Sequence, residues 1–263
     1  MTEKLVHIGI DLHGTLITND EFLSEGSKDD LKNVLRSRPE DFKVYICTGN
    51  DLGFLQRKIP DILELFDGAV LETGCVISED MRTEEIIVPE NIVEQLKTLE
   101  NTLIDCDYSE VYKFARRLAT ISMFTKYGQP LEKFYDKIRE ELKYLDYARV
   151  TRSSVAVDII PSRHNKMTGL EYFGKDKDVF VAIADSLNDI EWLTDSDLSF
   201  MPGNADSSAT EILSSKKERK NIGEELDTKS FYVSREKETF GVIDILKNIF
   251  HKLQRPDSIR DRQ

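Results

Sequence analysis

The sequence lacks the features of several large protein classes. It has only three cysteines, Cys47, Cys75 and Cys106, and none of them forms a C-x-x-C pair, which argues against a disulfide scaffold or a zinc cluster. No apolar run approaches the roughly 18 residues that a membrane helix requires. The N-terminus shows no signal-peptide pattern. These absences predict a soluble protein of the reducing cytoplasm.

Positive charge is also in deficit. The chain has 36 Lys and Arg residues against 49 Asp and Glu residues, which gives a net charge of -13. Such a surface repels the phosphate backbone, so we expect no nucleic-acid partner. A small anionic ligand remains compatible with this charge, because a bound cation or a local basic pocket reverses the field. With 263 residues, 40% of them hydrophobic, the chain suits one large domain or two modest ones.

Strands and helices alternate at both ends of the chain. Short apolar runs predict buried strands at 5–11, 43–47, 68–71 and 179–184. Ser27 and Asp30 resemble a capping box at the start of the first helix. The spacing predicts a parallel α/β sheet. Further elements are expected as strands at 198–201 and 231–233, helices at 164–174, 206–213 and 240–253, and a charged surface loop at 216–225.

The order of predicted strands and helices differs in the middle of the chain. Apolar residues on one face predict helices at 89–103 and 130–145, and strands are expected at 119–124, 147–151 and 155–160. This pattern favours a small α+β domain at residues 81–160. The parallel core would then comprise residues 1–80 and 161–263, with a frayed tail at 254–263.

Polar residues follow several of the predicted strands directly. Asp11 and Thr48 end the first two, and Asp185, Asn188 and Asp189 follow the strand at 179–184. Lys166 lies at the start of the preceding helix. Because ligands bind outside the carboxyl ends of parallel strands, we expect these groups to converge at one edge of the sheet.

The chemistry of this set is coherent. Asp11, Asp185 and Asp189 are hard oxygen donors that suit Mg²⁺. Thr48 and its turn could hold a phosphate, and Lys166 supplies a compact positive charge. An aspartate can also act as the nucleophile in phosphoryl transfer. Each residue alone would be an ordinary turn or capping residue, but the ordered combination indicates a site.

Five segments carry a resemblance to the haloacid dehalogenase (HAD) superfamily. The resemblance lies in Asp11–Leu16 (DLHGTL, against DxDGTL), Thr48–Asn50 (TGN), Lys166 in NKMTGL, Ala184–Asp189 (ADSLND) and Met201–Ala205 (MPGNA). The long interval between Thr48 and Lys166 places an inserted cap after the second motif. This arrangement is similar to the Cof-type, sucrose-phosphatase and archaeal phosphoglycolate-phosphatase-like branch.

The resemblance implies a Rossmann-like core, Mg²⁺ as cofactor and a role for each matching residue. Asp11 would be the nucleophile and a metal ligand. The other metal positions would be the backbone carbonyl of His13 and the carboxylates of Asp185 and Asp189. The phosphoryl group would contact Thr48, Gly49, Lys166 and Asn188. Lys166 would also orient Asp11.

His13 departs from the family pattern, because it stands where the second aspartate normally acts as general acid and base. Histidine, with a pKa of about 6.5, can serve either role near neutral pH. The alternatives are that histidine slows turnover and that the change carries no adaptive meaning. We favour phosphatase activity that is retained but weakened.

The resemblance implies a phosphatase acting on a small phosphorylated metabolite, with no nucleic-acid or membrane partner. Sugar phosphates, phosphoglycolate and mannosyl-phosphoglycerate-like substrates all remain open. A phosphometabolite-binding or regulatory protein and a phosphomutase are the alternatives. Basic side chains are available in or near the cap at Arg116, Arg117, Lys126, Arg149, Arg152 and Arg163, and the substrate contacts we expect are Arg116, Arg149 and Arg152.

Overall fold

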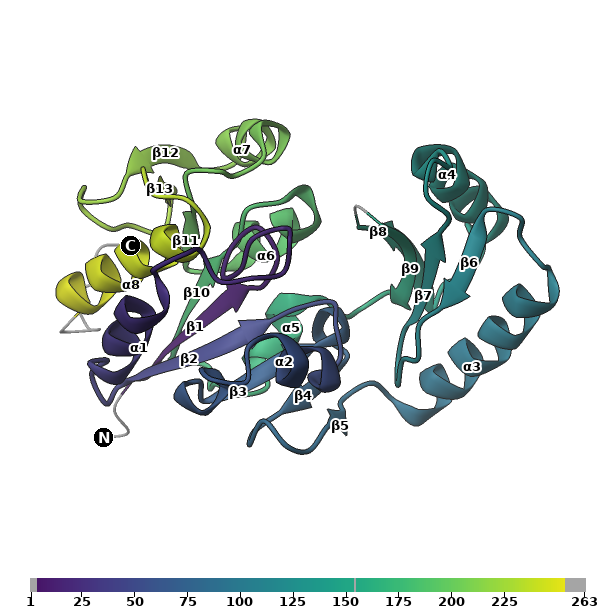
Figure 1. Cartoon of the computed structure of the whole chain (residues 1–263), viewed down its shortest axis with the longest axis horizontal. Helices are drawn as coiled ribbons and strands as arrows, with labels where there is room; N and C mark the ends of the chain where they lie inside the picture. The colour runs from purple at the N-terminus through teal and green to yellow at the C-terminus, as the bar shows by residue number, and fades with distance from the viewer. Residues whose placement is uncertain (1–3, 154, 254–263) are drawn as a thin grey trace.

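Two β-sheets organise the chain (Figure 1). The computed structural model describes residues 4–153 and 155–253, so the tail predicted at 254–263 lies outside the described residues. The first sheet has the strand order β12-β13-β11-β10-β1-β2-β3-β4-β5, and the second has the order β6-β7-β9-β8. The second sheet comes from the middle of the sequence. The predicted fold class, a Rossmann-like α/β core with an inserted α+β unit, is confirmed.

The first sheet is parallel over most of its width. Its pairs from β12 to β3 are parallel, whereas β4 and β5 are antiparallel additions at one edge. Its strands are β1 (Val6–Asp11), β2 (Phe42–Cys47), β3 (Gly68–Leu71), β4 (Val76–Ser78), β5 (Glu85–Ile86), β10 (Val179–Ile183), β11 (Leu198–Met201), β12 (Glu218–Asn221) and β13 (Ser230–Val233).

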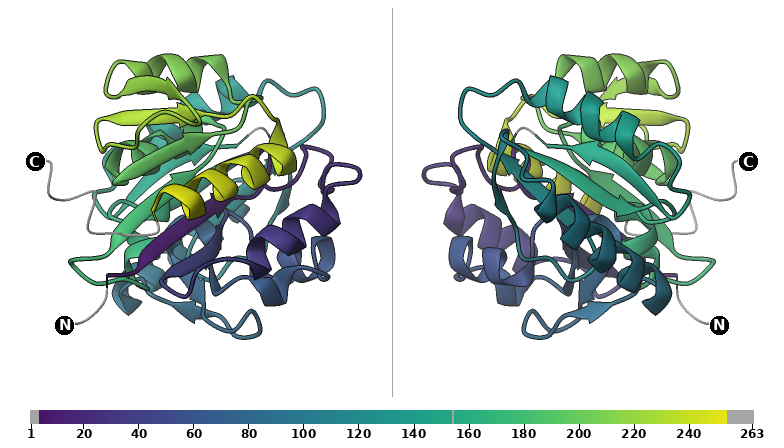
Figure 2. Two further views of the ribbon diagram at one scale, coloured as in Figure 1. Left: turned by 90° about the vertical axis from the view of Figure 1, so that its left-hand side faces the viewer. Right: turned by 90° about the vertical axis from the view of Figure 1, so that its right-hand side faces the viewer.

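Helices cover both faces of the first sheet (Figure 2). One face packs in a single apolar cluster with α1 (Lys28–Arg36), α2 (Leu52–Lys58) and α8 (Glu238–Lys252). The other face packs with α5 (Lys166–Glu171), α6 (Ile190–Asp195) and α7 (Ser207–Ser214). Both faces are therefore shielded from water, which explains why the sequences of the central strands are nearly continuous apolar runs.

Strand β1 shows how alternation serves the two faces. Ile8 and Ile10 point into the first apolar cluster. Gly9 points to the opposite face, where a side-chain Cβ would lie only 2.5 Å from the Trp192 ring. The glycine thus lets α6 approach the sheet closely and sets the position of the loop that precedes this helix.

The second sheet is antiparallel and has helices on one face. Its strands are β6 (Val111–Phe114), β7 (Ile121–Thr125), β8 (Ala148–Arg152) and β9 (Ala156–Pro161). The helices α3 (Glu90–Asp105) and α4 (Leu131–Glu141) pack around a separate apolar cluster that includes Phe134 and Ile138. They lie on the side away from the first sheet (Figure 1). The open face of the second sheet is therefore turned toward the first sheet.

Two local predictions are wrong. Ser27 has helical dihedral angles and makes no side-chain cap, because its Oγ donates to the Ser24 carbonyl at 2.6 Å in the preceding turn. The charged segment 216–225 contains β12, an edge strand paired with β13. Charged side chains suit such an edge because one side of the strand faces solvent. The short strands β4, β5 and β6 had no predicted counterpart.

All three cysteines are free thiols, with Cys47 and Cys75 buried and Cys106 exposed. Within residues 4–153 and 155–253, no helix combines the length and apolar character needed to cross a membrane.

Candidate active site

Three adjacent parallel strands end at the candidate site. The strands β10, β1 and β2 are neighbours in the first sheet. Asp11 is the last residue of β1, Thr48 directly follows β2, and Asp185 lies two residues after β10. The topology thus brings together groups that are separated by up to 174 residues in the sequence, counted from Asp11 to Asp185.

Lys166 lies between two of the predicted carboxylates. Its Nζ is 2.5 Å from Asp11 Oδ1 and 2.6 Å from Asp189 Oδ1, and its side chain is 8% exposed. Burial alone would lower the pKa of Lys166, but the two carboxylates outweigh it and raise this pKa. Lys166 is therefore a fixed cation at the nucleophile position.

Helix α5 holds Lys166 at its first residue. Asn165 caps this helix by accepting a hydrogen bond from Thr168 N, and the Thr168 hydroxyl completes a capping box. The capping box fixes the backbone immediately before Lys166, so the position of the ammonium follows from a local sequence pattern, N-x-x-T.

Asp185 is crowded by negative charge. Burial, together with nearby Asp11 and Asp189, raises the pKa of Asp185 to about 7. Thr15 Oγ1 donates to Asp185 Oδ1 at 3.1 Å. Gly14, with φ of 71°, lets the carboxylate approach the turn after β1, because a Cβ there would lie 2.3 Å from Asp185 Oδ2. A cation beside Asp185 would relieve this charge repulsion.

The donor set suits a divalent cation that takes few protein ligands. In the described part of the chain, no three His, Cys, Asp or Glu side chains form a ready metal cage. Mg²⁺, however, is often held by one or two carboxylates and keeps several waters. Asp11, Asp185 and the His13 carbonyl group would supply hard oxygens at neighbouring strand ends, and burial together with nearby Asp11 and Asp189 raises the pKa of Asp185.

The loop after β2 presents a hydroxyl. Thr48 Oγ1 accepts hydrogen bonds from Asn50 N at 3.2 Å and from Asn50 Nδ2 at 3.3 Å. These two bonds use the lone pairs of the hydroxyl oxygen, so its hydrogen is directed to another acceptor. Gly49 is exposed on the same loop. Both features suit a phosphoryl oxygen.

A turn in the left-handed region links this loop to α5. Glu72, Thr73 and Gly74 have φ angles of 45°, 57° and 93°. Thr73 N donates to the Thr48 carbonyl at 3.0 Å. At Gly74, a Cβ would lie 1.8 Å from the Asn165 carbonyl oxygen. The turn therefore sets the separation between Thr48 and Lys166.

The His13 imidazole packs beside the site. Its Nε2 is 3.9 Å from Glu21 Oε1, and its ring centroid is 5.4 Å from that of Phe54. Burial lowers the pKa of His13, although Glu21 acts in the opposite direction. The neutral imidazole is therefore favoured near pH 7.

The other predicted contacts lie at different places. Asn188 is exposed on the turn before α6. Arg149 Nη1, on β8, lies 2.8 Å from Glu191 Oε1, on α6, so this ion pair joins the middle segment to the core. Arg152 pairs with Glu132 at 2.7 Å within the middle segment. Arg116 is exposed. The two paired arginines are already neutralised by carboxylates.

Three residues outside the expected set join the site. Arg117 Nη1 is 3.3 Å from Asp51 Oδ2, in the loop that follows Thr48. The Glu72 carboxylate accepts hydrogen bonds from Leu118 N, Ala119 N and Thr120 Oγ1. Asn204 Nδ2 donates to the Gly14 carbonyl at 2.7 Å. Glu72 directly follows β3, so the strand-end argument used for Asp11 would have found it.

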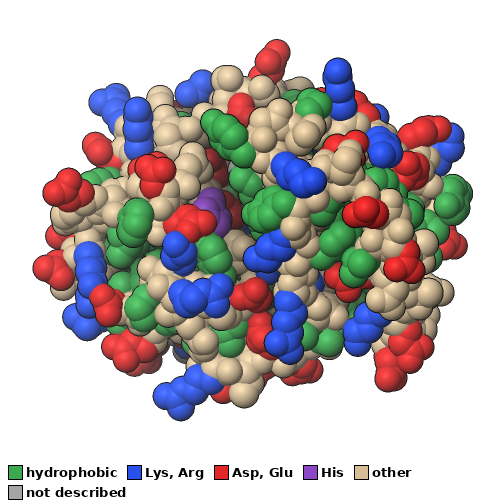
Figure 3. Space-filling view, turned by 45° about the vertical axis from the view of Figure 1, so that its right-hand side comes forward, with side chains coloured by type: hydrophobic (Ala, Val, Ile, Leu, Met, Phe, Trp, Pro, Cys, Tyr) green, Lys and Arg blue, Asp and Glu red, His purple; other side chains and the backbone are tan. Residues whose placement is uncertain are grey.

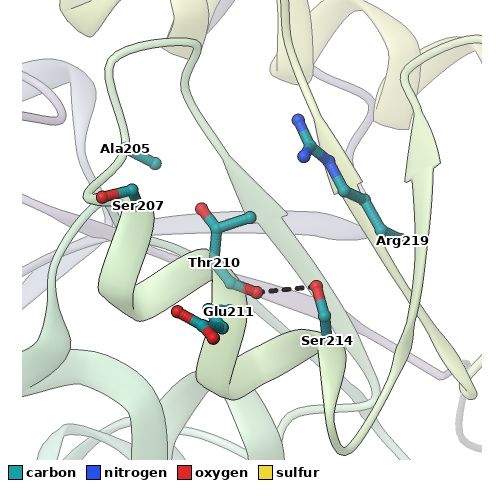
Figure 4. A pocket seen from close by; sticks show the side chains of 6 residues that line it. All are labelled: Ala205, Ser207, Thr210, Glu211, Ser214 and Arg219. Carbon is teal, nitrogen blue, oxygen red and sulfur yellow. Dashed lines mark hydrogen bonds between the residues drawn. The ribbon is translucent and has the colours of Figure 1, made fainter.

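The surface gives little further guidance to the site. Acidic and basic side chains are interspersed over the face in Figure 3, with apolar side chains between them. A shallow cavity of about 450 Å³ lies beside α7 (Figure 4). Its lining comprises Ala205, Ser207, Thr210, Glu211, Ser214 and Arg219, none of which is a predicted site residue.

Comparison with protein families agrees with this geometry. A sequence model of the haloacid dehalogenase-like hydrolases matches residues 98–221, a segment that contains Lys166, Asp185 and Asp189. This segment, a little under half of the chain, is similar to the haloacid dehalogenase-like superfamily. The predicted resemblance to this superfamily is confirmed. A search of curated proteins found no match.

Solved structures share the whole fold of this haloacid dehalogenase-like chain. A sucrose-phosphatase from Synechocystis, in complex with sucrose and phosphate, is 19% identical with a TM-score of 0.68, covering 95% of this chain and 98% of that chain. A haloacid dehalogenase-like hydrolase from B. subtilis is 14% identical with a TM-score of 0.59, covering 92% and 98%. A protein from Thermoplasma acidophilum is 14% identical with a TM-score of 0.66, covering 95% and 99%. At these identities the likeness establishes the fold.

Proposed function

We propose that this haloacid dehalogenase-like chain is a Mg²⁺-dependent phosphatase. Its substrate would be a small phosphorylated metabolite, a sugar phosphate or a phosphoglycolate-like acid, hydrolysed through an aspartyl-phosphate. The observation that carries the proposal is the buried Asp11–Lys166 pair, with Thr48 and Asp185 at the ends of the two adjacent strands. Positioning and charge neutralisation are the main requirements of phosphoryl transfer.

Two displacements would complete the reaction. A carboxylate oxygen of Asp11 bonds to phosphorus while the ester P–O bond breaks, and the leaving oxygen takes up a proton. Water then attacks the phosphorus, the bond to Asp11 breaks, and inorganic phosphate is released. Lys166 orients Asp11 and stabilises negative charge on the phosphoryl oxygens, and Thr48 donates its hydroxyl hydrogen to one of them.

Mg²⁺ is part of this proposal. Asp11, the His13 carbonyl oxygen and Asp185 would hold it, with Asp189 and Asn188 supporting the loop. The bound ion supplies positive charge that offsets the charge of the phosphate ester. Its presence would also remove the repulsion that raises the pKa of Asp185.

The inserted unit predicted at residues 81–160 would act as the cap that encloses the leaving group. In support, the second sheet turns its helix-free face toward the strand ends of the first. Glu72 and Arg117 make hydrogen bonds between the two parts. Such contacts hold the second sheet over the loop that carries Thr48.

His13 favours a second candidate, a protein that binds its phosphorylated ligand but turns it over slowly. The neutral imidazole that burial favours cannot protonate the leaving oxygen. General acid–base assistance typically contributes roughly 10²–10⁴-fold to the rate. We favour retained but weakened hydrolysis, because Asp11, Thr48, Lys166 and Asp185 are all in place.

Phosphate release from a panel of phosphorylated sugars and acids tests the proposal. We expect release with Mg²⁺, none with excess EDTA, and none from Asp11→Asn with either. Asp61→Asn is a matched control, since Asp61 is an exposed carboxylate that pairs with Lys28 away from the site. The control should retain wild-type activity.

Other outcomes point to the alternatives. Mg²⁺ binding without any phosphate release would support the slow or binding protein. Transfer of phosphate between positions on a sugar, stimulated by a bisphosphate, would support a phosphomutase. Phosphate release that persists in Asp11→Asn would contradict the nucleophile assignment.

A further inference from the structure

A polar row crosses the open face of the second sheet. Ser122 of β7 lies opposite Asp158 of β9, and Asp158 lies opposite Thr151 of β8. The alternate residues, among them Met123 and Val157, pack into the apolar cluster under α3 and α4. Because strand side chains alternate, the three polar groups share the helix-free face, which is turned toward the first sheet.

Arg117 connects this row to the phosphate loop. Its Nε donates to Ser122 Oγ at 3.4 Å, and its Nη2 donates to Asn50 Oδ1 at 3.5 Å. Asn50 in turn donates to Thr48 Oγ1. One guanidinium group, with a side chain that is 6% exposed, therefore separates the row from the loop that carries Thr48. The row lies where a leaving group attached to the phosphate would extend.

The hydrogen bonds of the row leave acceptors open. Ser122 Oγ donates to Asp158 Oδ1 at 2.5 Å. Neither Asp158 Oδ2 nor the Thr151 hydroxyl makes a hydrogen bond to another of the described residues. A substrate hydroxyl could donate to the carboxylate oxygen, and such charge-assisted bonds are among the stronger hydrogen bonds in proteins.

The charges of the region disfavour an acidic leaving group. Arg117 is already paired with Asp51, and Asp158 adds a further carboxylate. Arg149 and Arg152, two of the three cations expected to hold a second anionic group, are paired with Glu191 and Glu132, and the third, Arg116, is exposed and is not part of the row. A carboxylate or second phosphate placed against the row would therefore meet the negative charge of Asp158.

We propose that Ser122, Asp158 and Thr151 form a leaving-group subsite for a neutral, hydroxyl-rich group such as a sugar or polyol. The subsite selects against phosphoglycolate-like acids and bisphosphates. This inference rests on the proposed phosphatase function and narrows its substrate class. Arg117 links recognition by the row to the loop that holds the phosphoryl group.

Paired substrates separate the subsite from the chemistry. p-Nitrophenyl phosphate has a leaving group without hydroxyls, so it reports the phosphatase reaction alone. Hexose and pentose phosphates, with glycerol 3-phosphate, report the subsite, whereas phosphoglycolate and 3-phosphoglycerate report acidic leaving groups. We expect wild-type kcat/KM to be highest for one of the hydroxylated neutral esters.

Asp158→Asn is the decisive variant. Loss of the charge-assisted acceptor should reduce kcat/KM for that ester by roughly 10- to 100-fold. Activity on p-nitrophenyl phosphate should stay within about twofold of wild type, because the row does not contact the phosphoryl group. Asp136→Asn, on the cap helix α4 and paired with Arg139, is the matched control and should alter neither activity.

The outcomes distinguish the two proposals. Equal losses on both kinds of substrate in Asp158→Asn, or a wild-type preference for the acidic esters, would overturn the subsite while leaving the phosphatase intact.

If wild type releases no phosphate from any ester, the phosphatase proposal fails. The subsite is then tested by calorimetric binding of the same esters to Asp11→Asn and to the Asp11→Asn, Asp158→Asn double variant. Tighter binding of a neutral ester that is lost in the double variant supports the subsite, and equal binding by the two variants overturns it.

Discussion

At the scale of single residues, His13 distinguishes this chain from the motif that it resembles. The imidazole lies against Phe54, and its Nε2 is 3.9 Å from Glu21 Oε1. Its lowered pKa favours the neutral form at pH 7. A carboxylic acid at this position would have a shorter side chain and a different reach. Under the proposed mechanism, this residue would therefore set how well the leaving oxygen is protonated.

Restoring the aspartate should raise the rate. We expect His13→Asp to increase kcat on an alkyl phosphate by at least about tenfold, within the usual range of general acid–base assistance. The gain should be small on p-nitrophenyl phosphate, whose leaving oxygen needs little protonation. Steady-state assays of phosphate release would measure both. Adding Asp11→Asn to this variant should abolish the activity, and an unchanged or lower kcat in His13→Asp would show that histidine is a competent replacement.

At the scale of elements, short segments between the regular elements determine the geometry of the site. The turn at Glu72–Gly74 joins β3 to β4, contacts the Thr48 carbonyl and abuts Asn165 at the start of α5. Its left-handed backbone is strained for Glu72 and Thr73. The strain is tolerated because the carboxylate of Glu72 holds the cap segment through three hydrogen bonds.

Gly74→Ala should impair both stability and catalysis. Its Cβ would lie 1.8 Å from the Asn165 carbonyl oxygen, at a φ of 93°. We expect a loss of roughly 2–4 kcal/mol in the free energy of unfolding, measured by urea titration, from strain and overpacking. Displacement of α5 should also lower kcat through Lys166.

Gly128→Ala provides the matched control. Gly128 has a φ of 81°, and nothing lies within 4 Å of a Cβ placed there. This variant should cost only about 1 kcal/mol, the penalty of the left-handed conformation, and should keep full activity. Equal effects of the two substitutions would show that the contact with Asn165 is unimportant.

At the scale of the whole molecule, a buried polar group serves stability at the amino end of the central strand β1, away from the candidate site. His7 Nε2 lies 3.1 Å from Asp178 Oδ2, and His7 Nδ1 lies 3.2 Å from the Tyr45 hydroxyl. The ring stacks on Phe180 and is 1% exposed. Burial lowers the pKa of His7 and outweighs the opposing effect of Asp178. The folded state therefore holds this histidine neutral.

The sign of the resulting pH dependence follows from linkage. Below about pH 6.5 the unfolded chain binds a proton at His7 more readily than the folded chain does. The contribution of His7 to the free energy of unfolding should therefore be fully developed above that pH and should decline as the pH falls. Urea titrations between pH 7.5 and pH 5 would measure it. His13 and His164 also have lowered pKa values and add to this decline, whereas Asp185, whose pKa is raised to about 7, acts against it.

His7→Gln isolates the contribution of His7. The variant should show a shallower decline than wild type, whereas His251→Gln, at an exposed position in the last turn of α8, should keep the wild-type slope. Identical slopes in wild type and His7→Gln would contradict the assignment. Because His7 lies at the amino end of β1 and Asp11 at the carboxyl end, phosphatase activity should report separately from this effect.

The amino-acid sequence by itself determined the parallel core, the inserted α+β unit and the superfamily. Apolar runs report burial on both faces of a sheet, and Asp11, Thr48 and Asp185 follow such runs directly. The capping box that holds Lys166 was equally local.

The tertiary structure alone decided which cap residue reaches the core, because Arg116 and Arg117 are adjacent in sequence and only the packing of the loop between β6 and β7 places Arg117 beside Asp51. It also decided the pairing of Arg149 and Arg152, the row formed by Ser122, Asp158 and Thr151, and the direction of the His13 ring. These depend on strand register and on contacts between distant segments, which periodicity along one chain does not encode.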